Sequence, residues 1–472
     1  MAGTRMRGVL LWLFVSGLLV VALLSLVALS GPHPARAERA AAATLFVSAN
    51  GSGSECSQGH PCALQTALGQ AAAGDTLYVG AGTYTHTAGT VVSVTQSITL
   101  LGGWDGSPSG PPQRDPAAFP TIFDGRRQGT VVVLSFGRFV LDGFTITGGW
   151  GDSGGGMRVD RAQAEIRNNV ITANGTYTFS TWEGGRGGAM ALFWGAPITI
   201  THNHFISNTS GYGGALYVDT HQAWISDNVF ARNYALRRGG AICFESGSGG
   251  EVLRSLFQDN VAGDDGGAML IWDSAPRVEA NRLIHNTARV GAAMSLGNNA
   301  APLLVNNWLA HNEGVAISSG QSSPRIVNNT LIGITREIGI RVMASSDCAL
   351  PTCGAVTINN NIIMRCRYGV EVSGMLTGTL DYNDVWANDR GDYSGQAADW
   401  RGPHGLSADP RLVNEPAGDL HLRHGSPCID AGDARLAPDT DIDGERRPMG
   451  RGVDIGADEH PPYALFLPLV RR

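Results

Sequence analysis

The chain has 472 residues, of which 64 are glycine, and it carries 34 basic against 41 acidic residues. This acidic excess argues against nucleic acid as a partner, because nucleic-acid-binding surfaces gather basic side chains. All the basic residues are arginine, so the chain has no lysine for a Walker-type phosphate site or for Schiff-base chemistry. The high glycine content favours a fold made largely of turns.

The N-terminal segment has the pattern of an export signal. Arg5 and Arg7 precede an uncharged run over residues 8–31, and Ala-Arg-Ala at 35–37 has the form of a cleavage site. The run is longer than that of an ordinary signal peptide and long enough to span a bilayer. Residues 1–37 are therefore either a cleaved signal peptide or a membrane anchor. In both cases we expect the body of the protein to be extracellular or on the cell surface.

Residues 38–90 are predicted to form an N-terminal cap with the first strands. A strand is expected at 44–48 and a short helix at 63–73, which would cover the open end of a sheet structure. The segment "FVSANGSG…PCALQTALGQAAAGDTLYVGAGTYT" (46–85) resembles the beginning of secreted bacterial right-handed β-helix proteins with the pectin-lyase-like fold.

The seven cysteines fit an oxidising compartment. Cys56 with Cys62, and Cys348 with Cys353, each enclose a short loop and are the predicted disulfides. The other three cysteines leave at least one thiol unpaired. A structural zinc site is not expected, since the chain has no C-x-x-C pair.

A repeat governs the chain from 91 to 388 and is most regular over 187–312. Gly-Gly-Ala motifs, the last one degenerate, begin at residues 187, 213, 239, 266 and 291, so successive copies are 26, 26, 27 and 25 residues apart. A second motif, F-x-x-N, runs in phase with them and ends at Asn208, Asn233 and Asn260. A fixed period of this size indicates a solenoid.

The pattern inside each repeat identifies the kind of solenoid. Runs such as Ala-Leu-Tyr-Val-Asp (215–219) alternate with period 2 and lack a helical stripe. Short strands separated by glycine and asparagine bends are typical of the coils of a parallel β-helix. The predicted fold is therefore all-β, a right-handed parallel β-helix with a short helical cap. The paired motifs also resemble repeats of the chlamydial polymorphic outer-membrane proteins, and this resemblance implies adhesion.

The C-terminal part departs from the repeat. Residues 389–425 are predicted to be an exit loop. The segment "SPCIDAGDARLAPDTDIDGERRPMGRGVDIGADEH" (426–460) resembles the module that commonly closes secreted β-helix proteins. The apolar tail, 461–472, is predicted to be a terminal strand, or alternatively a sorting signal.

One strand column offers candidate ligand-binding side chains. The residues six positions after the first glycine of each motif are Phe193, Asp219, Glu245 and Trp272, and Tyr217 lies two positions before Asp219. Alternation predicts that these side chains point away from the core. Aromatic rings stack on sugars and carboxylates bind hydroxyls or calcium. The alternatives are that these residues are solvent-facing cross-strand pairs, or that the aromatic rings are covered by a loop.

Three other clusters have weaker claims to chemistry. Asp439, Asp441 and Asp443 match the start of a calcium loop, although the glutamate of an EF-hand is missing, and turn capping by the aspartates is the alternative. Arg237-Arg238 and Asp264-Asp265 are expected to form salt bridges between adjacent coils. Asp259, His285 and His311 fall in one column, which we interpret as solvated ladder residues rather than a metal site.

The sequence thus predicts an exported protein that binds glycans or surfaces without catalysis, with no cofactor other than a possible calcium ion. The expected partner is an extracellular polysaccharide or a cell surface, with membrane contact only through an uncleaved N-terminal segment. Two alternatives stay open, a structural spacer and a polysaccharide lyase or hydrolase of the pectin-lyase-like fold. In the enzymatic alternative Asp219 and Glu245 would act as the acid and base.

Overall fold

The computed structural model describes residues 41–461 except 88, 178–183, 196, 221, 345–354 and 375–376. The predicted export segment (1–37), the Cys348–Cys353 pair and the tail from 462 onward lie outside the described residues. No helix among the described residues is long and apolar enough to cross a membrane. The following account concerns the unit Ala43–Arg472.

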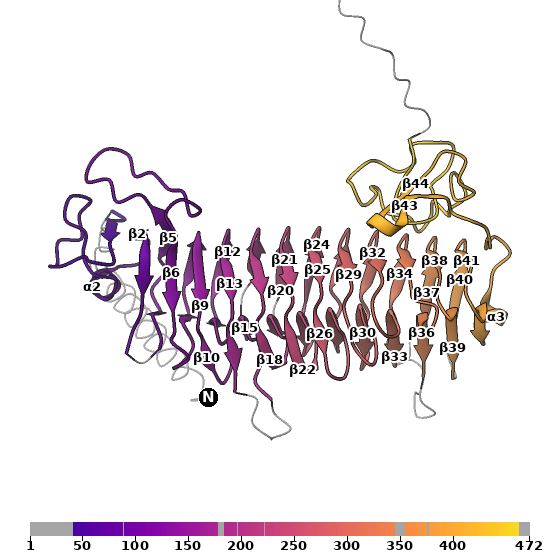
Figure 1. The fold of residues 1–472 in the computed structure, drawn as a ribbon, viewed down its shortest axis with the longest axis horizontal. Helices are drawn as coiled ribbons and strands as arrows, with labels where there is room; N and C mark the ends of the chain where they lie inside the picture. The colour runs from indigo at the N-terminus through magenta and orange to yellow at the C-terminus, as the bar shows by residue number, and fades with distance from the viewer. Residues whose placement is uncertain are drawn as a thin grey trace, which may run out of the picture. The chain divides into compact units, whose positions relative to one another are not determined.

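Short parallel strands stack coil upon coil into a β-solenoid (Figure 1). Sheet A has thirteen strands: β1 (Thr44–Val47), β2 (Thr76–Gly80), β5 (Thr99–Trp104), β8 (Arg138–Asp142), β12 (Gln163–Arg167), β16 (Ile198–Thr201), β20 (Gln222–Ser226), β24 (Gly249–Leu253), β28 (Arg277–Glu279), β31 (Leu303–Val305), β34 (Arg325–Val327), β37 (Val356–Asn359) and β40 (Gly378–Asp381). Sheet B has twelve: β3 (Gly82–Tyr84), β6 (Thr121–Asp124), β9 (Phe144–Thr147), β13 (Val170–Thr172), β17 (His204–Ile206), β21 (Val229–Ala231), β25 (Leu256–Gln258), β29 (Arg282–Ile284), β32 (Trp308–Ala310), β35 (Thr330–Ile332), β38 (Ile362–Met364) and β41 (Asp384–Trp386).

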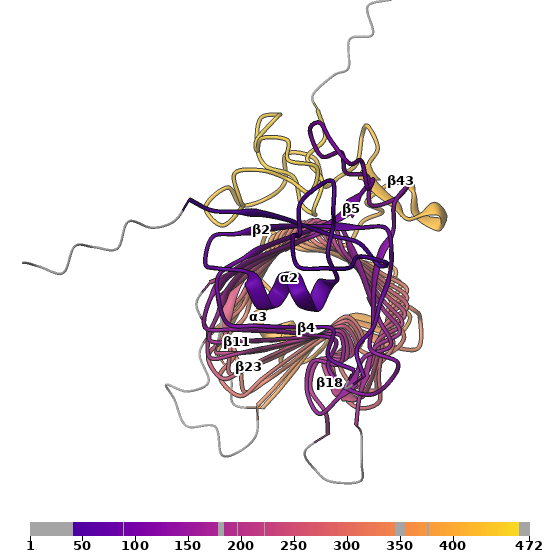
Figure 2. The same ribbon diagram turned by 90° about the vertical axis from the view of Figure 1, so that its left-hand side faces the viewer.

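Two further sheets complete the cross-section (Figure 2). Sheet C has twelve strands: β4 (Val92–Val94), β7 (Val132–Ser135), β11 (Met157–Asp160), β15 (Met190–Phe193), β19 (Leu216–Asp219), β23 (Ile242–Glu245), β27 (Met269–Trp272), β30 (Met294–Gly297), β33 (Ile317–Gly320), β36 (Ile338–Met343), β39 (Tyr368–Ser373) and β42 (Gly391–Gly395). Sheet D has five strands, each of which follows a strand of sheet B and precedes a strand of sheet C along the chain: β10 (Trp150–Gly151), β14 (Gly175–Thr176), β18 (Thr209–Tyr212), β22 (Tyr234–Arg238) and β26 (Val261–Ala262).

The repeat motifs have a direct physical explanation in this stack. The first glycine of each pair takes a left-handed backbone, as at Gly239 with φ 66°, which costs glycine least. The second glycine lies against the next coil, because a Cβ on Gly240 would stand 2.0 Å from the carbonyl oxygen of Gly267. The phenylalanines of the F-x-x-N motif stack inside the core, with 4.7 Å between the ring centroids of Phe205 and Phe230.

The asparagines of the motif form buried ladders at the bends. Each side chain accepts the backbone N–H of the preceding coil and bonds the asparagine of the next coil, as Asn233 does with Asn208 and Asn260. A second ladder follows sheet A at Asn169, Asn203, Asn228, Asn281, Asn307, Asn329, Asn361 and Asn383. The ladders satisfy backbone groups that the turns leave without strand partners.

Short helices cover both ends of the core. Helix α2 (Leu64–Gln70) lies across the N-terminal mouth, as predicted (Figure 2), and buries Leu64, Ala67 and Leu68. At the other end the predicted exit loop (389–425) is wrong. It contains strand β42 of sheet C, helix α3 (Ala397–Trp400) and an antiparallel hairpin of β43 (Leu412–Asn414) and β44 (Asp419–Leu422) around a 3-10 turn (Glu415–Ala417). The loop is polar in sequence because much of its surface faces solvent.

The C-terminal module (residues 426–460) does not close the solenoid. Together with the β43–β44 hairpin it lies on the flank of the last coils (Figure 1), with Ile442 and Ile455 packed in one apolar cluster with Trp308 and Ile362 of sheet B. Asparagines at the turns after sheet A hold it by hydrogen bonds, at Asn306, Asn328 and Asn360. The end-closing role falls to α3, whose Ala397 is fully buried in the main core.

Conspicuous charged residues of the C-terminal module hold the module itself together. Arg447 and Glu459 form a fully buried ion pair at 2.7 Å. Asp441 accepts the backbone N–H of Glu459 at 3.1 Å, and Asp454 accepts that of Asp430 at 2.7 Å. These charged residues therefore have a structural role.

Candidate functional site

The predicted binding column on sheet C is in register but is not an open surface. Phe193, Asp219 and Glu245 pair directly on β15, β19 and β23. However, Phe193 is 5% exposed and Tyr217 is 1% exposed. Both lie in a second apolar cluster with Cys243 and Leu270, outside the main core. The side chains lie outside the main core, as alternation predicts, but the rings of Phe193 and Tyr217 do not face solvent.

Arginines of the turn region beside sheet D cover two aromatic rings of this column, those of Tyr217 and Trp272. The Arg186 guanidinium lies 5.3 Å from the Tyr217 ring centroid, and that of Arg238 lies 5.0 Å from the Trp272 ring, which is half-buried. The alternative that the aromatic rings are covered is thus confirmed for Phe193 and Tyr217. The predicted salt bridges are also present, between Arg237 and Asp264 at 3.4 Å and between Arg238 and Asp265 at 3.3 Å.

Glu245 and Asp219 are half-buried at the edge of this covered cluster. Glu245 accepts the Tyr217 hydroxyl at 2.7 Å and the Cys243 thiol at 3.7 Å. Burial, first of all, and the nearby carboxylate raise the pKa of Tyr217, so its hydroxyl stays protonated and keeps donating to Glu245. This arrangement employs Glu245 as a fixed hydrogen-bond acceptor.

The three aspartates of the predicted calcium loop do not converge. Asp441 is buried, and its two oxygens accept the backbone N–H groups of Asp443, Glu445 and Glu459. The structure therefore assigns Asp441 to turn capping, the alternative interpretation. Asp439 is exposed, and Asp443 instead meets His421. In the column after sheet B, His285 lies 3.9 Å from Asp259 and stacks on His311, all at left-handed turn positions.

Two carboxyl groups with strongly raised pKa values, Asp384 and Asp454, lie in structural positions. Burial raises the pKa of Asp384 to about 6 and that of Asp454 to about 7. Asp384 accepts the Ala408 N–H at 3.0 Å and the Cys428 thiol at 3.2 Å. Carboxyl groups with raised pKa values indicate an active site where they line a cleft. Asp384, the first residue of β41, is instead covered by the C-terminal module.

Replacing Asp384 with asparagine should therefore weaken the pH dependence of stability. A folded pKa of about 6 exceeds the unfolded value of about 3.9, so the proton-linked stabilisation is fully present below about pH 4 and is lost as the pH rises through about 6. Between pH 4 and pH 8 the wild-type protein should lose about 2–3 kcal/mol more than Asp384→Asn. Urea unfolding at the two pH values measures this, and parallel pH profiles for both proteins would contradict it.

Exposed aromatic side chains lie instead at the turn between sheets C and A. Phe136 is 65% and Trp194 is 53% exposed. They occupy the same turn position on two coils that are separated by one coil, and Arg161 holds this position on the coil between them. The Arg161 guanidinium lies 5.8 Å from the Phe136 ring and 5.4 Å from the Trp194 ring. We call Phe136, Arg161 and Trp194 the aromatic stripe.

The aromatic stripe was not predicted from the sequence. The prediction named Phe193 instead of its neighbour Trp194. A signal was present in the repeat. The position seven after the first glycine reads Trp194, Thr220, Ser246, Asp273 and Asn298, so tryptophan replaces short polar residues in one coil. All five have positive φ, and short polar residues tolerate that backbone better than bulky ones.

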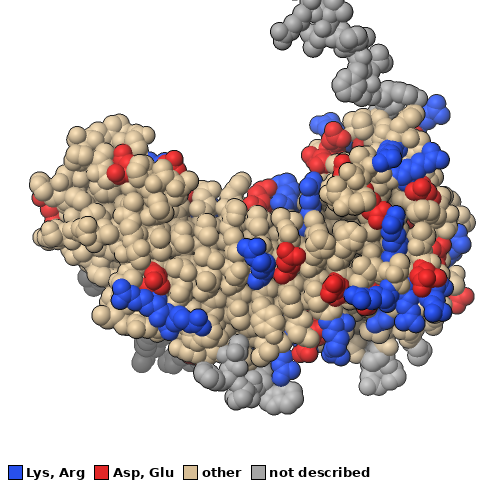
Figure 3. Space-filling view, in the orientation of Figure 1, with Lys and Arg blue, Asp and Glu red and all other residues tan. Residues whose placement is uncertain are grey.

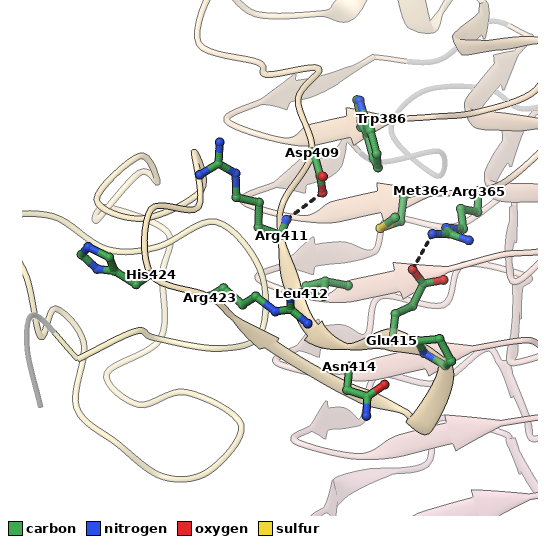
Figure 4. Close-up of a pocket in the computed structure, with 11 residues that line it drawn as sticks. Met364, Arg365, Trp386, Asp409, Arg411, Leu412, Asn414, Glu415, Arg423 and His424 are labelled. Carbon is green, nitrogen blue, oxygen red and sulfur yellow. Dashed lines mark hydrogen bonds and ion pairs between the residues drawn. The ribbon is translucent and has the colours of Figure 1, made fainter.

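Two hollows lie elsewhere on the molecule. On the face seen in Figure 3, the surface sinks between the loop 105–120 and the C-terminal module, and most charged side chains lie over the central and C-terminal coils. A pocket of about 360 Å³ opens between the β43–β44 hairpin and sheet B (Figure 4). Its charged groups bind one another or backbone carbonyls, as Arg365 does with Glu415 at 2.9 Å and Arg411 with the Gly425 carbonyl.

Comparison with known families accords with this architecture. A family model described as "Right handed beta helix region" matches residues 121–283, 214–331 and 264–401, which together exceed half of the 472 residues. The chain belongs to this right-handed β-helix family. No curated protein matches it in sequence. The predicted fold class is confirmed, whereas the resemblance to chlamydial repeats stays a prediction.

Several solved structures are similar to this β-helix protein at low identity and low TM-score. One is pectate lyase Pel9A, with 14% identity, a TM-score of 0.46 and coverage of 89% of this chain and 96% of that chain. Another is the PL6 family alginate lyase AlyGC, with 14% identity, a TM-score of 0.49 and coverage of 84% and 58%. A third is an alginate lyase from Paenibacillus sp. str. FPU-7, with 15% identity, a TM-score of 0.34 and coverage of 77% and 99%. These likenesses concern the fold alone.

Proposed function

We propose that this β-helix protein is exported and binds an extracellular acidic polysaccharide through the aromatic stripe, without cleaving it. The observation that carries the proposal is the exposure of Phe136 and Trp194 around Arg161. Aromatic faces provide apolar platforms for sugar rings. A cell surface that presents such a polysaccharide would be bound in the same way.

The backbone at the aromatic stripe supports a functional interpretation. Phe136 and Trp194 have φ values of 64° and 49°, a conformation that costs a bulky residue about 1–3 kcal/mol. Their exposed rings recover only part of that cost by burial. Short polar side chains occupy the same position in later coils at lower cost. Retaining aromatic rings here is therefore better explained by a ligand than by stability.

Geometry and charge support a linear anionic ligand. Phe136 and Trp194 are two coils apart, about 10 Å at the usual strand spacing and roughly the length of two pyranose units. Three arginines lie along this edge, namely Arg138, Arg158 and Arg161. The one carboxylate at these strand ends is that of Asp160, which pairs with Arg158 and Arg161. Guanidinium groups recognise carboxylates in two-pronged fashion, so sugars that bear carboxylates should bind more tightly than neutral ones.

Features elsewhere in the chain support export. The first 37 residues have the pattern of a signal peptide or anchor. Cys56 and Cys62, a pair predicted from the sequence, form a disulfide with an S–S distance of 1.99 Å. Structural disulfides persist mainly in oxidising compartments. These features support our proposal of a secreted or surface-held binder outside the cytoplasm.

A glycan array with the full chain tests the proposal. Wild-type protein should bind uronate-bearing polysaccharides, and Trp194→Ala should weaken binding about 5- to 30-fold, as stacking contacts of about 1–2 kcal/mol imply. Trp224→Ala is the matched control, because Trp224 is a tryptophan that is 39% exposed and lies on sheet A, outside the aromatic stripe. Equal losses in both variants would contradict a stripe-specific site.

The same glycans should be assayed for turnover. Absorbance at 235 nm and reducing ends should not rise over hours, with or without calcium. Because Asp219 and Glu245 lie in register on adjacent coils, Asp219→Ala and Glu245→Ala are the appropriate variants if activity is found. Turnover that both variants abolish would replace binding by catalysis as the function.

A further inference from the structure

A histidine and three carboxylates converge where the β43–β44 hairpin meets the C-terminal module. His421 lies on β44, and its Nδ1 is 2.5 Å from Oδ1 of Asp419 on the same strand. Its Nε2 is 2.7 Å from Oδ2 of Asp443, which belongs to the loop with the calcium-like pattern. His421 also meets the edge of the Trp308 ring, at 4.9 Å between centroids.

Asp458 brings a third ligand group to this point. One ligand atom each from His421, Asp443 and Asp458 lie within 4.8 Å of one another, and this is the one such group among the described residues. Asp458 is 5% exposed. Its Oδ2 accepts the Leu422 N–H at 2.7 Å. A carboxylate buried to this extent favours a cation beside it.

The charges around the cluster do not balance without an ion. Asp419, Asp443 and Asp458 carry three negative charges when ionised, and Asp441 stands close enough to act on Asp458. One protonated imidazole offsets a single charge. The nearby Arg282 stacks on the Trp308 ring at 4.6 Å and acts on Asp419. A divalent cation bound at Nε2 would take the place of the imidazolium proton, and together with Arg282 it would match the three carboxylates in charge.

We propose that His421, Asp443 and Asp458 bind a divalent transition-metal ion of the zinc class, with Asp419 orienting the imidazole. Imidazole nitrogen with carboxylate oxygen suits zinc, whereas calcium prefers oxygen ligands alone. An Nδ1–H donated to a carboxylate is the usual support of a metal-bound histidine. At zinc bond lengths two ligand atoms stand roughly 3.4 Å apart, so the Nε2–Oδ2 pair has to open by less than about 1 Å.

The ion would join three separate segments of the chain. It would tie β44 to the loop of Asp443 and to the terminal segment of Asp458, beside Trp308 of the solenoid. A pocket of about 170 Å³ is lined by Asp443, Gly444 and Glu279 among others, so it borders the site at Asp443. The metal thus has a structural role, in which it fixes the C-terminal module on the flank.

Metal content and binding of the untagged full chain test the assignment. After removal of metal with EDTA, titration with zinc chloride should show one ion bound per chain, with calcium bound at least 10-fold more weakly. Asp443→Asn changes an exposed loop residue and should keep the fold, as far-UV circular dichroism checks, while zinc affinity falls at least 10-fold. Asp419→Asn should lower it about 10- to 100-fold through the imidazole orientation.

The matched control is the histidine–aspartate pair on the solenoid. His285 lies 3.9 Å from Asp259, and this pair lacks the converging third carboxylate, so His285→Ala should leave zinc binding unchanged. A folded Asp443→Asn protein that binds zinc like the wild type would overturn the assignment. Absence of zinc binding in the wild-type protein would also overturn it and would leave His421 as a protonated bridge between two carboxylates.

Discussion

Replacing Asn233 with alanine is expected to lower the free energy of unfolding by about 3–5 kcal/mol. Asn233 is fully buried, and its Oδ1 accepts both the backbone and the side-chain N–H of Asn208, at 3.1 and 3.0 Å. Its Nδ2 donates to the Phe205 carbonyl and to Asn260. Each buried group left without a partner costs about 1–3 kcal/mol, and alanine leaves several.

Urea unfolding followed by circular dichroism measures this loss. The matched control is Asn414→Ala, because Asn414 is exposed and its side chain makes no capping hydrogen bond. That variant should stay within about 0.5 kcal/mol of the wild type. If both variants unfold at the wild-type urea concentration, the asparagine ladder is not a main source of stability.

Replacing Glu459 with glutamine should release the C-terminal module from the flank of the solenoid. The Arg447 and Glu459 side chains are 1% and 0% exposed, and Glu459 also accepts the N–H groups of Met449 and Asp454 at 3.0 Å each. Glutamine removes the carboxylate that is ion-paired with the Arg447 guanidinium and turns an NH₂ group toward one of those donors. Breaking a buried pair on one side costs about 3–5 kcal/mol.

Limited proteolysis should detect the effect as cleavage within residues 426–460 at protease levels that spare the wild-type protein. Asp264→Asn is the control, since the Arg237–Asp264 pair has side chains 47% and 35% exposed, and such pairs contribute only about 0–1 kcal/mol. A Glu459→Gln module as resistant as the wild type would show that the pair is dispensable for docking.

The repeat allowed the coil, the core and the ladders to be predicted from the sequence. Glycine pairs indicate a left-handed turn, as at Gly239, and F-x-x-N motifs indicate a buried amide, as at Asn233. Both features can be predicted from the sequence alone. The Cys56–Cys62 disulfide and the Arg238–Asp265 salt bridge followed from loop length and coil register. These features depend on contacts within one coil or between neighbours.

The binding surface could not be predicted in the same way, because alternation separates core from exterior but does not identify what covers the exterior. Tyr217 points away from the main core and is still buried, because Arg186 and its surroundings beside sheet D cover the ring. The position of the C-terminal module depends on contacts such as Asn306 with Thr440, far apart in the chain. His421 was overlooked because its partners Asp443 and Asp458 follow more than twenty residues later.

The most direct test of the proposed function is calorimetric titration of the full chain with uronate oligosaccharides of increasing length. Two aromatic platforms about 10 Å apart predict that affinity rises steeply once the oligomer spans both rings, and then levels off. The double variant Phe136→Ala/Trp194→Ala should lose that rise, while Trp224→Ala keeps it. Affinity that does not depend on length, or that survives loss of both rings, would contradict glycan binding by the aromatic stripe.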